Sequence, residues 1–292
     1  MGFFFLIIML KHQPSTLMRL DSHQHFWNYN PAEYPWIKPA WPIRRSFLPD
    51  DLAVELNSRQ IAGCVAVQAR QCVRESEWLL ELADRSPFIK GVVGWVDLRA
   101  TDVALPLGRL AKHSRFVGVR HVLQDEADAD FMLSREFQRG IAQLREFDLT
   151  YDLLIFPQQL PAAIRLVSTF PEQPFVLDHI AKPAIKEGAM EPWRGHIQKL
   201  AAFPNVYCKV SGLITEADWG RWQPSQFWPY LDVVFAAFGP DRIMFGSDWP
   251  VALLAGTYQQ VYELAREYVA PLGLAVESAF FGGNAVKFYQ LS

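Results

Sequence analysis

The feature that most constrains the fold is a regular alternation of short apolar runs with amphipathic stretches of helical period. Eight such runs, rich in β-branched residues, cover residues 19–25, 61–68, 90–97, 116–122, 149–156, 175–179, 206–211 and 242–248. Amphipathic stretches lie between them, for example 74–85, 134–147, 160–170, 193–203 and 226–238. This alternation predicts parallel strands joined by helices, because a parallel crossover needs a connection of helix length.

Two architectures share this alternation, a closed (β/α)8 TIM barrel and a doubly wound open sheet. The chain has 292 residues, half of them apolar, which is enough for the ~250 residues that an α/β barrel commonly uses. No GxGxxG or Walker loop follows any run, and polar residues end runs spread over the whole chain. Those ends converge on one mouth only in a barrel. We therefore predict one TIM barrel over residues 18–292, with the site at the C-terminal mouth of its strands.

The amino-terminal stretch 3–10 is fully apolar, but it is too short to span a bilayer and no basic residue precedes it. Met18 stands directly before Arg19 and the first run. We expect residues 1–17 to be a non-native or disordered extension from a misplaced start codon.

Composition narrows the choice of partner. The net charge is −3 and no block of five or more like charges occurs, which argues against nucleic acid and a membrane surface and favours a small-molecule substrate. The three cysteines, with no CxxC spacing, predict a reduced, cytoplasmic protein without cysteine-bound zinc. Self-association is left open.

Four polar side chains end equivalent runs. His23 and His25 lie two apart, so a strand would point both imidazoles to one face. His179 ends the sixth run and Asp248 the eighth. A pair of histidines alone is a weak signal, because such residues are often structural, but four groups at equivalent strand ends favour a metal or a substrate oxygen. Other runs end in Asp97, Lys209 and Ser211, where a capping or solvated residue is the commoner case.

These motifs, together with Gly282-Gly283-Asn284-Ala285, resemble the amidohydrolase superfamily over nearly the whole chain. The branch most similar is that of barrels that hydrolyse sugar lactones, the L-fuconolactone and L-rhamnonolactone hydrolases. The resemblance implies that Asp248 is the general base that takes a proton from the attacking water. It further implies that His23, His25 and His179 gather around the substrate carbonyl or a divalent ion.

The metal prediction is mixed. His23, His25 and Asp248 could bind one divalent ion, and imidazole with carboxylate ligands suits zinc. Many members of the superfamily complete the metal site with a lysine, glutamate or histidine from strands four and five. The corresponding runs here offer Arg120, His121, Tyr151 and Asp152, and arginine cannot ligate a cation. We therefore predict an ion that is weakly bound or dispensable, and no organic cofactor.

Several residues are candidates for substrate binding. Arg120 could donate to a lactone carbonyl or a sugar hydroxyl, whereas the adjacent His121 points to the opposite face of a regular strand. The long segment 26–49 predicts either an aromatic lid over a sugar ring or a loop that only packs on its neighbours or on a subunit partner. The full set of predicted binding residues is Arg120, His121, Trp27, Trp36, Gln68 and Lys182.

Two other functions stay open. A hydrolase of a carboxylated lactone or pyrone, or a decarboxylase, would need several basic residues at the mouth, where only Arg70, Arg120 and Lys182 are candidates. A non-catalytic binding barrel is disfavoured, because an aspartate buried with three histidines is costly unless it is used.

Overall fold

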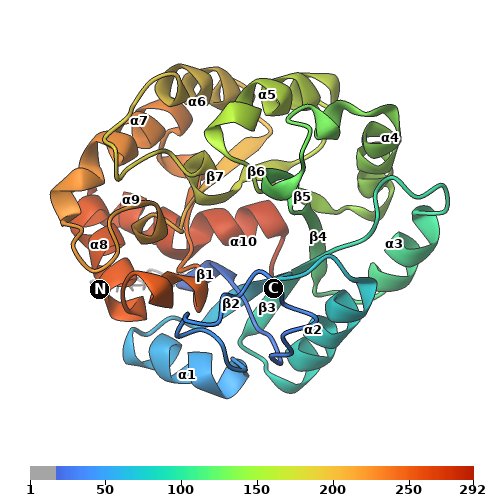
Figure 1. Cartoon of the computed structure of the whole chain (residues 1–292), viewed down its shortest axis with the longest axis horizontal. Coiled ribbons are helices and arrows are strands. Elements are labelled where there is room, and N and C mark those ends of the chain that lie inside the picture. Colours follow the sequence, from blue (N-terminus) through green and yellow to red (C-terminus); the bar gives the residue numbers. More distant parts are fainter. Residues whose placement is uncertain (1–17) are drawn as a thin grey trace, which may run out of the picture.

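The computed structural model describes residues 18–292, which form eight parallel strands in sequential order around a barrel (Figure 1). The strands are β1 (Leu20–Gln24), β2 (Gly63–Val67), β3 (Ile89–Gly94), β4 (Phe116–His121), β5 (Thr150–Leu153), β6 (Phe175–Leu177), β7 (Val206–Val210) and β8 (Ile243–Phe245). The predicted (β/α)8 TIM barrel is confirmed. The expectation for residues 1–17 falls outside the part of the chain that the structure describes.

Each strand ends one to three residues before the corresponding apolar run does. The last residues of the runs leave the hydrogen-bonded ladder at the mouth, where loops diverge. The polar side chains that end the runs are therefore free to turn into the cavity above the barrel.

The barrel closes through residues just beyond β8. His25 N–H donates to the Trp249 carbonyl at 2.7 Å, and Asp248 N–H donates to the His23 carbonyl at 2.8 Å. Gln24 and Trp249 form a parallel bridge at the same place. The seam thus brings the first and last motifs of the sequence together.

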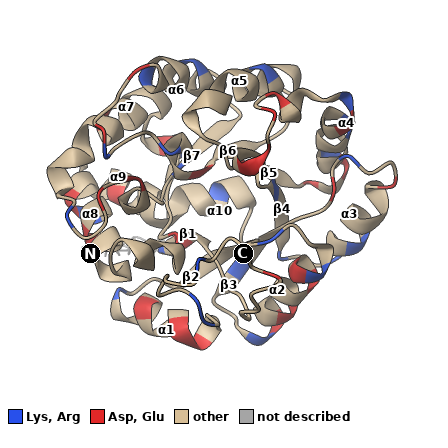
Figure 2. Ribbon diagram, in the orientation of Figure 1, with Lys and Arg blue, Asp and Glu red and all other residues tan. Residues whose placement is uncertain are grey.

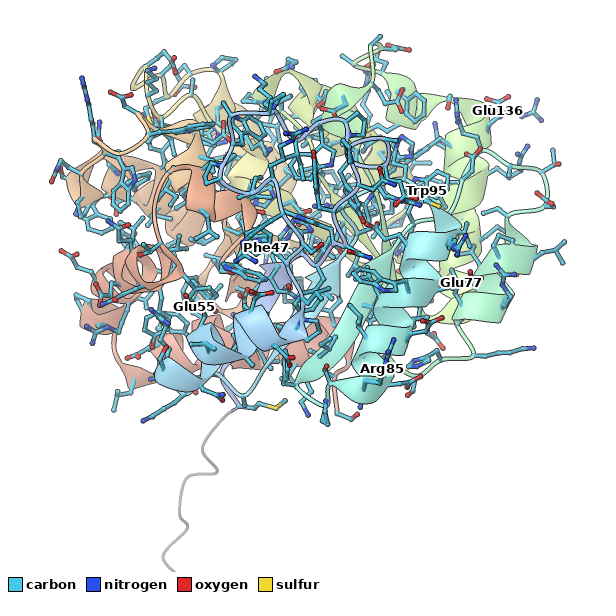
Figure 3. The ribbon with its side chains drawn as sticks, turned by 60° about the horizontal axis from the view of Figure 1, so that its bottom comes forward. Phe47, Glu55, Glu77, Arg85, Trp95 and Glu136 are labelled. Atoms are coloured by element: carbon cyan, nitrogen blue, oxygen red, sulfur yellow. The ribbon has the colours of Figure 1, made fainter. Side chains whose placement is uncertain are left out.

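A ring of helices surrounds the strands: α1 (Pro49–Ser58), α2 (Val73–Arg85), α3 (Ala104–Leu110), α4 (Arg135–Leu144), α5 (Leu160–Thr169), α6 (Trp193–Ala201), α7 (Trp228–Phe238) and α8 (Tyr258–Val269). Many of the Lys, Arg, Asp and Glu residues lie on the helices and loops of this ring (Figure 2). Figure 3 shows Glu77 and Arg85 pointing away from the barrel, as residues on a solvated helix face do. The helical stretches predicted from periodicity correspond to α2, α4, α5, α6 and α7.

The chain ends with α9 (Leu274–Ser278), a π-helical turn (Ala279–Gly283) and α10 (Asn284–Tyr289). Helix α10 lies across the barrel in Figure 1, and its Phe288 and Tyr289 pack on the first residues of the strands, among them Leu20 and Val117. The end of the barrel opposite the mouth is therefore covered by α10. Among residues 18–292, no helix is long and apolar enough to cross a membrane.

The segment between β1 and α1 forms a separate lobe at the mouth. Trp27 and Phe47 exchange both backbone hydrogen bonds, at 3.1 and 2.9 Å, so the two ends of the loop are joined. The residues between them fold back on each other, which makes this lobe a packed structure rather than an open strand connection.

Candidate active site

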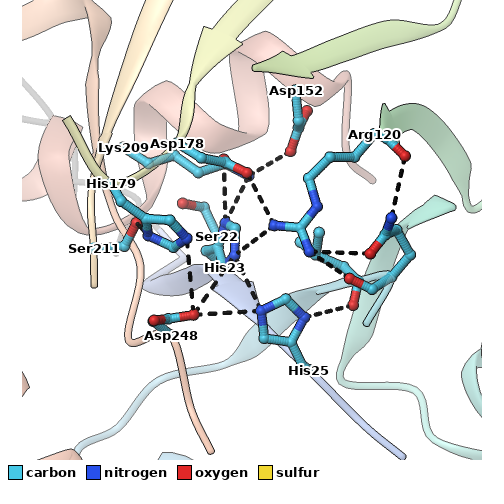
Figure 4. A network of polar contacts seen from close by, with 12 residues as sticks. Ser22, His23, His25, Arg120, Asp152, Asp178, His179, Lys209, Ser211 and Asp248 are labelled. Atoms are coloured by element: carbon cyan, nitrogen blue, oxygen red, sulfur yellow. Dashed lines mark hydrogen bonds and ion pairs between the residues drawn. The ribbon is translucent and has the colours of Figure 1, made fainter. Parts of the chain in front are cut away.

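A cavity of about 860 Å³ opens at the C-terminal mouth of the barrel. Seven of the residues predicted from the sequence line it: His25, Trp36, Gln68, Arg120, His179, Lys182 and Asp248. His23 lies just beneath its floor, fully buried (Figure 4). Strand ends distant in the sequence therefore meet at one point, as a barrel requires.

The Asp248 carboxylate is surrounded by imidazoles. Its Oδ1 lies 3.3 Å from His25 Nε2, 3.8 Å from His23 Nε2 and 3.9 Å from His179 Nε2. Burial opposes the ionised form, but the His179 charge interaction and the hydrogen bond from His25 outweigh it and lower the pKa of Asp248 below its ordinary value. Asp248 is thus ionised at neutral pH.

In His25 and His179 the Nδ1 atom, which faces away from Asp248, has a hydrogen-bond partner. His25 Nδ1–H donates to the Val67 carbonyl at 2.8 Å, and His179 Nδ1 contacts Ser211 Oγ at 2.8 Å. Burial lowers the pKa of His179 to about 4. The ring is therefore neutral at pH 7, and the Nε2 atoms of both histidines face the centre of the cluster.

This donor set fits a divalent ion. His23, His179 and Asp248 each offer one ligand atom, and the three atoms lie within 4.8 Å of one another. Two imidazoles and a carboxylate are ligands that zinc accepts. The metal site predicted from the sequence contained His25 in place of His179. His25 Nε2 also lies near these atoms, 3.3 Å from His23 Nε2. Arg120 Nη1, at 3.3 Å, competes for the same His23 nitrogen.

Beneath this cluster, side chains of opposite charge fill the barrel interior (Figure 4). Lys209 Nζ lies 2.5 Å from Asp152 Oδ2, 3.1 Å from Asp178 Oδ1 and 3.1 Å from His23 Nδ1. All of these side chains are fully buried, so the view of Lys209 as a capping or solvated residue is wrong. Neither Asp152 nor Asp178 was among the residues predicted to bind a ligand or to catalyse the reaction. By contrast, Asp97 is 43% exposed, as expected.

Arg120 and His121 point to opposite sides of β4. Arg120 reaches into the barrel, donating to Gln68 Oε1 and to Asp178 Oδ2, both at 3.1 Å. His121 lies outside the cavity, where Trp95 Nε1–H donates to its Nδ1 and its ring stacks on Phe131. The structure therefore gives His121 no contact with a ligand in this cavity.

Of the two tryptophans predicted to bind substrate from the lobe between β1 and α1, Trp36 lines the cavity and Trp27 does not. Trp36 lines the wall, where its Nε1–H donates to the Ala69 carbonyl at 3.2 Å. Trp27 is fully buried, donates to the Arg45 carbonyl and packs edge-on against Trp36. Trp27 therefore supports Trp36 and does not reach the cavity. Trp219, from the loop after β7, lines the cavity without having been predicted.

His179 and Lys182 are presented by a left-handed turn. Residues 179–182 have φ values of 54, 49, 60 and 49°, in a region that residues other than glycine disfavour. Both end residues of the turn line the cavity. Such strain persists only where surrounding structure enforces it, and it is typical of functional sites.

The sequence and the fold are both similar to those of known proteins. The model of the amidohydrolase family matches residues 20–291. The chain is 42% identical to an L-fucono-1,5-lactonase of Burkholderia multivorans, over 94% of this chain and 96% of that protein. It is 37% identical to an L-fucono-1,5-lactonase of Burkholderia ambifaria, with the same coverage of both chains. The chain is also 43% identical in sequence to an amidohydrolase of Burkholderia multivorans whose crystal structure contains bound zinc. The two structures superimpose with a TM-score of 0.89, over 94% of this chain and all of that one.

Proposed function

The chain belongs to the amidohydrolase family, and from that premise we propose that it hydrolyses the ester bond of a sugar lactone, an aldonolactone of the L-fucono or L-rhamnono type. One observation carries the proposal: an ionised, buried carboxylate, Asp248, ringed by three imidazoles at the base of a cavity large enough for a small sugar. Such a group can activate water beside an ester carbonyl.

Asp248 acts as the general base. Its lowered pKa keeps it ionised, so it is ready to accept a proton from water, but it must pass that proton on quickly. His25 Nε2, at 3.3 Å, is the nearest imidazole nitrogen. Since His25 Nδ1 is bonded to the Val67 carbonyl, Nε2 is the nitrogen through which His25 can exchange a proton with Asp248.

The substrate carbonyl needs a positive group beside its oxygen. The guanidinium of Arg120 lines the cavity next to His23, where it can donate to the developing oxyanion. When bound, a divalent ion held by His23, His179 and Asp248 would polarise the same carbonyl. Because Arg120 supplies positive charge at this point, we propose that the ion is dispensable.

The cavity favours a neutral polyhydroxylated ring. Of its cationic lining residues in the described chain, Arg70 is paired with Glu33 at 2.7 Å and Arg120 with Asp178 at 3.1 Å, which leaves Lys182 alone without a carboxylate in contact. A dicarboxylated lactone or pyrone, or a decarboxylase substrate, would need at least two free cations. Trp36 and Trp219 offer aromatic faces on which a sugar ring can stack.

The reaction would take place in the cytoplasm, which is consistent with three free cysteines. The partner that we propose is the small-molecule lactone itself.

The test is a hydrolysis assay with L-fuconolactone, L-rhamnonolactone and a dicarboxylated lactone. The neutral lactones should be opened faster by a wide margin, and Asp248→Asn should lower kcat at least ~10²-fold. Asp97→Asn is the matched control, because this aspartate also follows a strand but is exposed outside the cavity. Preference for the dicarboxylated substrate, or near wild-type kcat in the folded Asp248→Asn variant, would refute the proposal.

A further inference from the structure

Opening a lactone releases an alkoxide, and neither Asp248 nor His179 is placed to give that oxygen a proton. Asp248 is ionised, and both nitrogens of His179 already face a partner, Ser211 Oγ at 2.8 Å and Asp248 Oδ1 at 3.9 Å. An aliphatic alkoxide is far more basic than water at neutral pH, so a positioned acid would speed its departure.

Besides Asp248, four carboxyl groups line the same cavity: Glu33, Asp125, Glu126 and Glu216. Glu33 is paired with Arg70 and Glu126 with His121, and Asp125 is exposed, which leaves Glu216. Strand β7 continues through Gly212 into a short 3-10 helix, Ile214–Glu216, and Glu216 is among the lining residues. The turn runs directly against the catalytic cluster: a Cβ placed on Gly212 would lie 2.6 Å from His179 Nδ1 and 3.2 Å from Asp248 Oδ2. Glu216 therefore projects from an element that touches two of the groups assigned to the reaction.

The backbone around Glu216 is fixed on both sides. Glu216 N–H donates to the Leu213 carbonyl at 3.1 Å, and Lys186 N–H donates to the Glu216 carbonyl at 3.0 Å. Thr215 Oγ–H donates to the Gly212 carbonyl at 2.8 Å, which closes the turn. A carboxyl group on such a braced turn can meet the requirement of precise placement that acid catalysis imposes.

We propose that Glu216 is the general acid that protonates the ring oxygen of the lactone as it leaves. The proposal rests on the lactone hydrolysis proposed above and deepens it. Asp248 and Glu216 then have opposite tasks: Asp248 takes a proton from water, and Glu216 gives one to the alkoxide.

The surroundings of Glu216 suit a proton donor. Burial raises the pKa of Glu216 above its ordinary value, with Lys182 opposing this and the negative charges of Asp248 and Glu187 adding to it. The nearby Lys186 is turned to Asp218, at 3.9 Å. Environments that push two carboxyl pKa values apart are the usual mark of an acid and a base working as a pair.

The proposed steps balance. Water adds to the carbonyl carbon and loses one proton to Asp248. The bond from that carbon to the ring oxygen then breaks, its electron pair stays on the oxygen, and the Glu216 proton goes to that oxygen. The product is an open-chain hydroxy acid, which ionises to its carboxylate, and the proton on Asp248 restores Glu216 through solvent.

The experiment compares Glu216→Gln with wild type on two kinds of lactone. One is aliphatic, either an aldonolactone or δ-valerolactone, and the other is an aryl lactone whose leaving group is a phenol. We expect kcat on the aliphatic lactone to fall about 10²-fold with KM nearly unchanged. On the aryl lactone the loss should stay below about 10-fold, because a phenoxide leaves without a proton.

The pH profile gives a second readout. In wild type, kcat on the aliphatic lactone should fall on the alkaline side as Glu216 loses its proton, and this limb should be absent in Glu216→Gln. Glu136→Gln is the control, because Glu136 is exposed on α4, does not line the cavity and does not act on the pKa of Glu216. Thermal unfolding of all three proteins establishes that each is folded.

Equal losses on both lactones, or an unchanged alkaline limb, would overturn the role of Glu216 while leaving lactone hydrolysis intact. Hydrolysis of δ-valerolactone but of no aldonolactone would refute the sugar assignment, and the leaving-group comparison would still decide for or against Glu216. If wild type opens no lactone at all, both proposals are wrong.

Discussion

Replacing Lys209 by methionine should destabilise the barrel by a predictable amount. Lys209 stands between Asp152 and Asp178, at 2.5 and 3.1 Å, and all three side chains are fully buried. Removing the cation leaves two buried carboxylates short of a partner, and breaking a buried pair in this way costs about 3–5 kcal/mol.

The other contacts of these carboxylates place the cost at the lower end. Tyr289 Oη–H still donates to Asp152 at 2.9 Å, and Arg120 still donates to Asp178 at 3.1 Å. A loss of about 3 kcal/mol corresponds to a fall in Tm of about 6 °C, since a domain of this size loses roughly 2 °C for each kcal/mol.

The assay is thermal unfolding followed by circular dichroism, with chelator present so that metal binding does not contribute to stability. The double variant Lys209→Met/Asp152→Asn removes one charge of each sign and should recover most of the lost Tm. A single variant as stable as wild type, or a double variant less stable than the single one, would refute this view of the buried pair.

Three further predictions concern the site and its support. Gly212→Ala should lower kcat at least about 10-fold, because the new Cβ would meet His179 Nδ1 at 2.6 Å. Gly220→Ala controls for backbone strain alone, since Gly220 has φ +74° and no atom lies within 4 Å of its added Cβ. Equal losses of kcat in the two variants would contradict the steric argument. Burial raises the pKa of Glu75 from its ordinary 4.5 to about 7, so between these pH values the native state binds a proton that the unfolded state does not. The free energy of unfolding, measured by urea denaturation, should therefore fall as pH rises from about 4.5 to 7. Glu75→Gln should flatten this dependence on pH, and an unchanged dependence would contradict the assignment. Removing metal with a chelator should leave substantial lactonase turnover, measured beside metal content, whereas complete loss that only a divalent ion restores would show that Arg120 cannot replace the ion.

The barrel could be predicted from the sequence because its signal is repeated. Each run carries the same information, an apolar strand that ends in a polar residue, and eight repeats separated by helical stretches leave few architectures. The same repetition explains why His23, His25, His179 and Asp248 could be brought to one point without coordinates: residues at the ends of barrel strands share a mouth.

The buried charges could not be predicted in the same way. Lys209 is 57 residues from Asp152 in the sequence, and each looks like a polar residue that ends or interrupts a strand. Whether such a residue turns inward or outward depends on the register of its strand, which the apolar pattern leaves open when both faces are buried. At Arg120 and His121 simple alternation was enough, because the two neighbours had to take opposite faces.

The lobe between β1 and α1 shows a different limit of prediction from sequence. Trp27 and Trp36 lie in the same aromatic segment, and the sequence does not distinguish their roles. The backbone pairing of Trp27 with Phe47 is what places Trp27 beneath Trp36. This pairing depends on how the two ends of a long loop meet, which no periodicity reports. The choice between a ligand-facing and a supporting aromatic residue therefore required the fold of the loop itself.

The seam of the barrel links fold and chemistry most directly. Asp248 has φ +57° and donates its backbone N–H to the His23 carbonyl, so the carboxylate is anchored to β1 and not only to β8. The next hydrogen bond across the seam, from His25 N–H to Trp249, fixes the neighbouring imidazole in the same way. The 3.3 Å separation of His25 and Asp248 is therefore set by two backbone contacts that also close the barrel. Opening the barrel at that seam would therefore separate the proposed base from its nearest imidazole, and this is why a carboxylate at the end of the last strand can work with histidines at the end of the first.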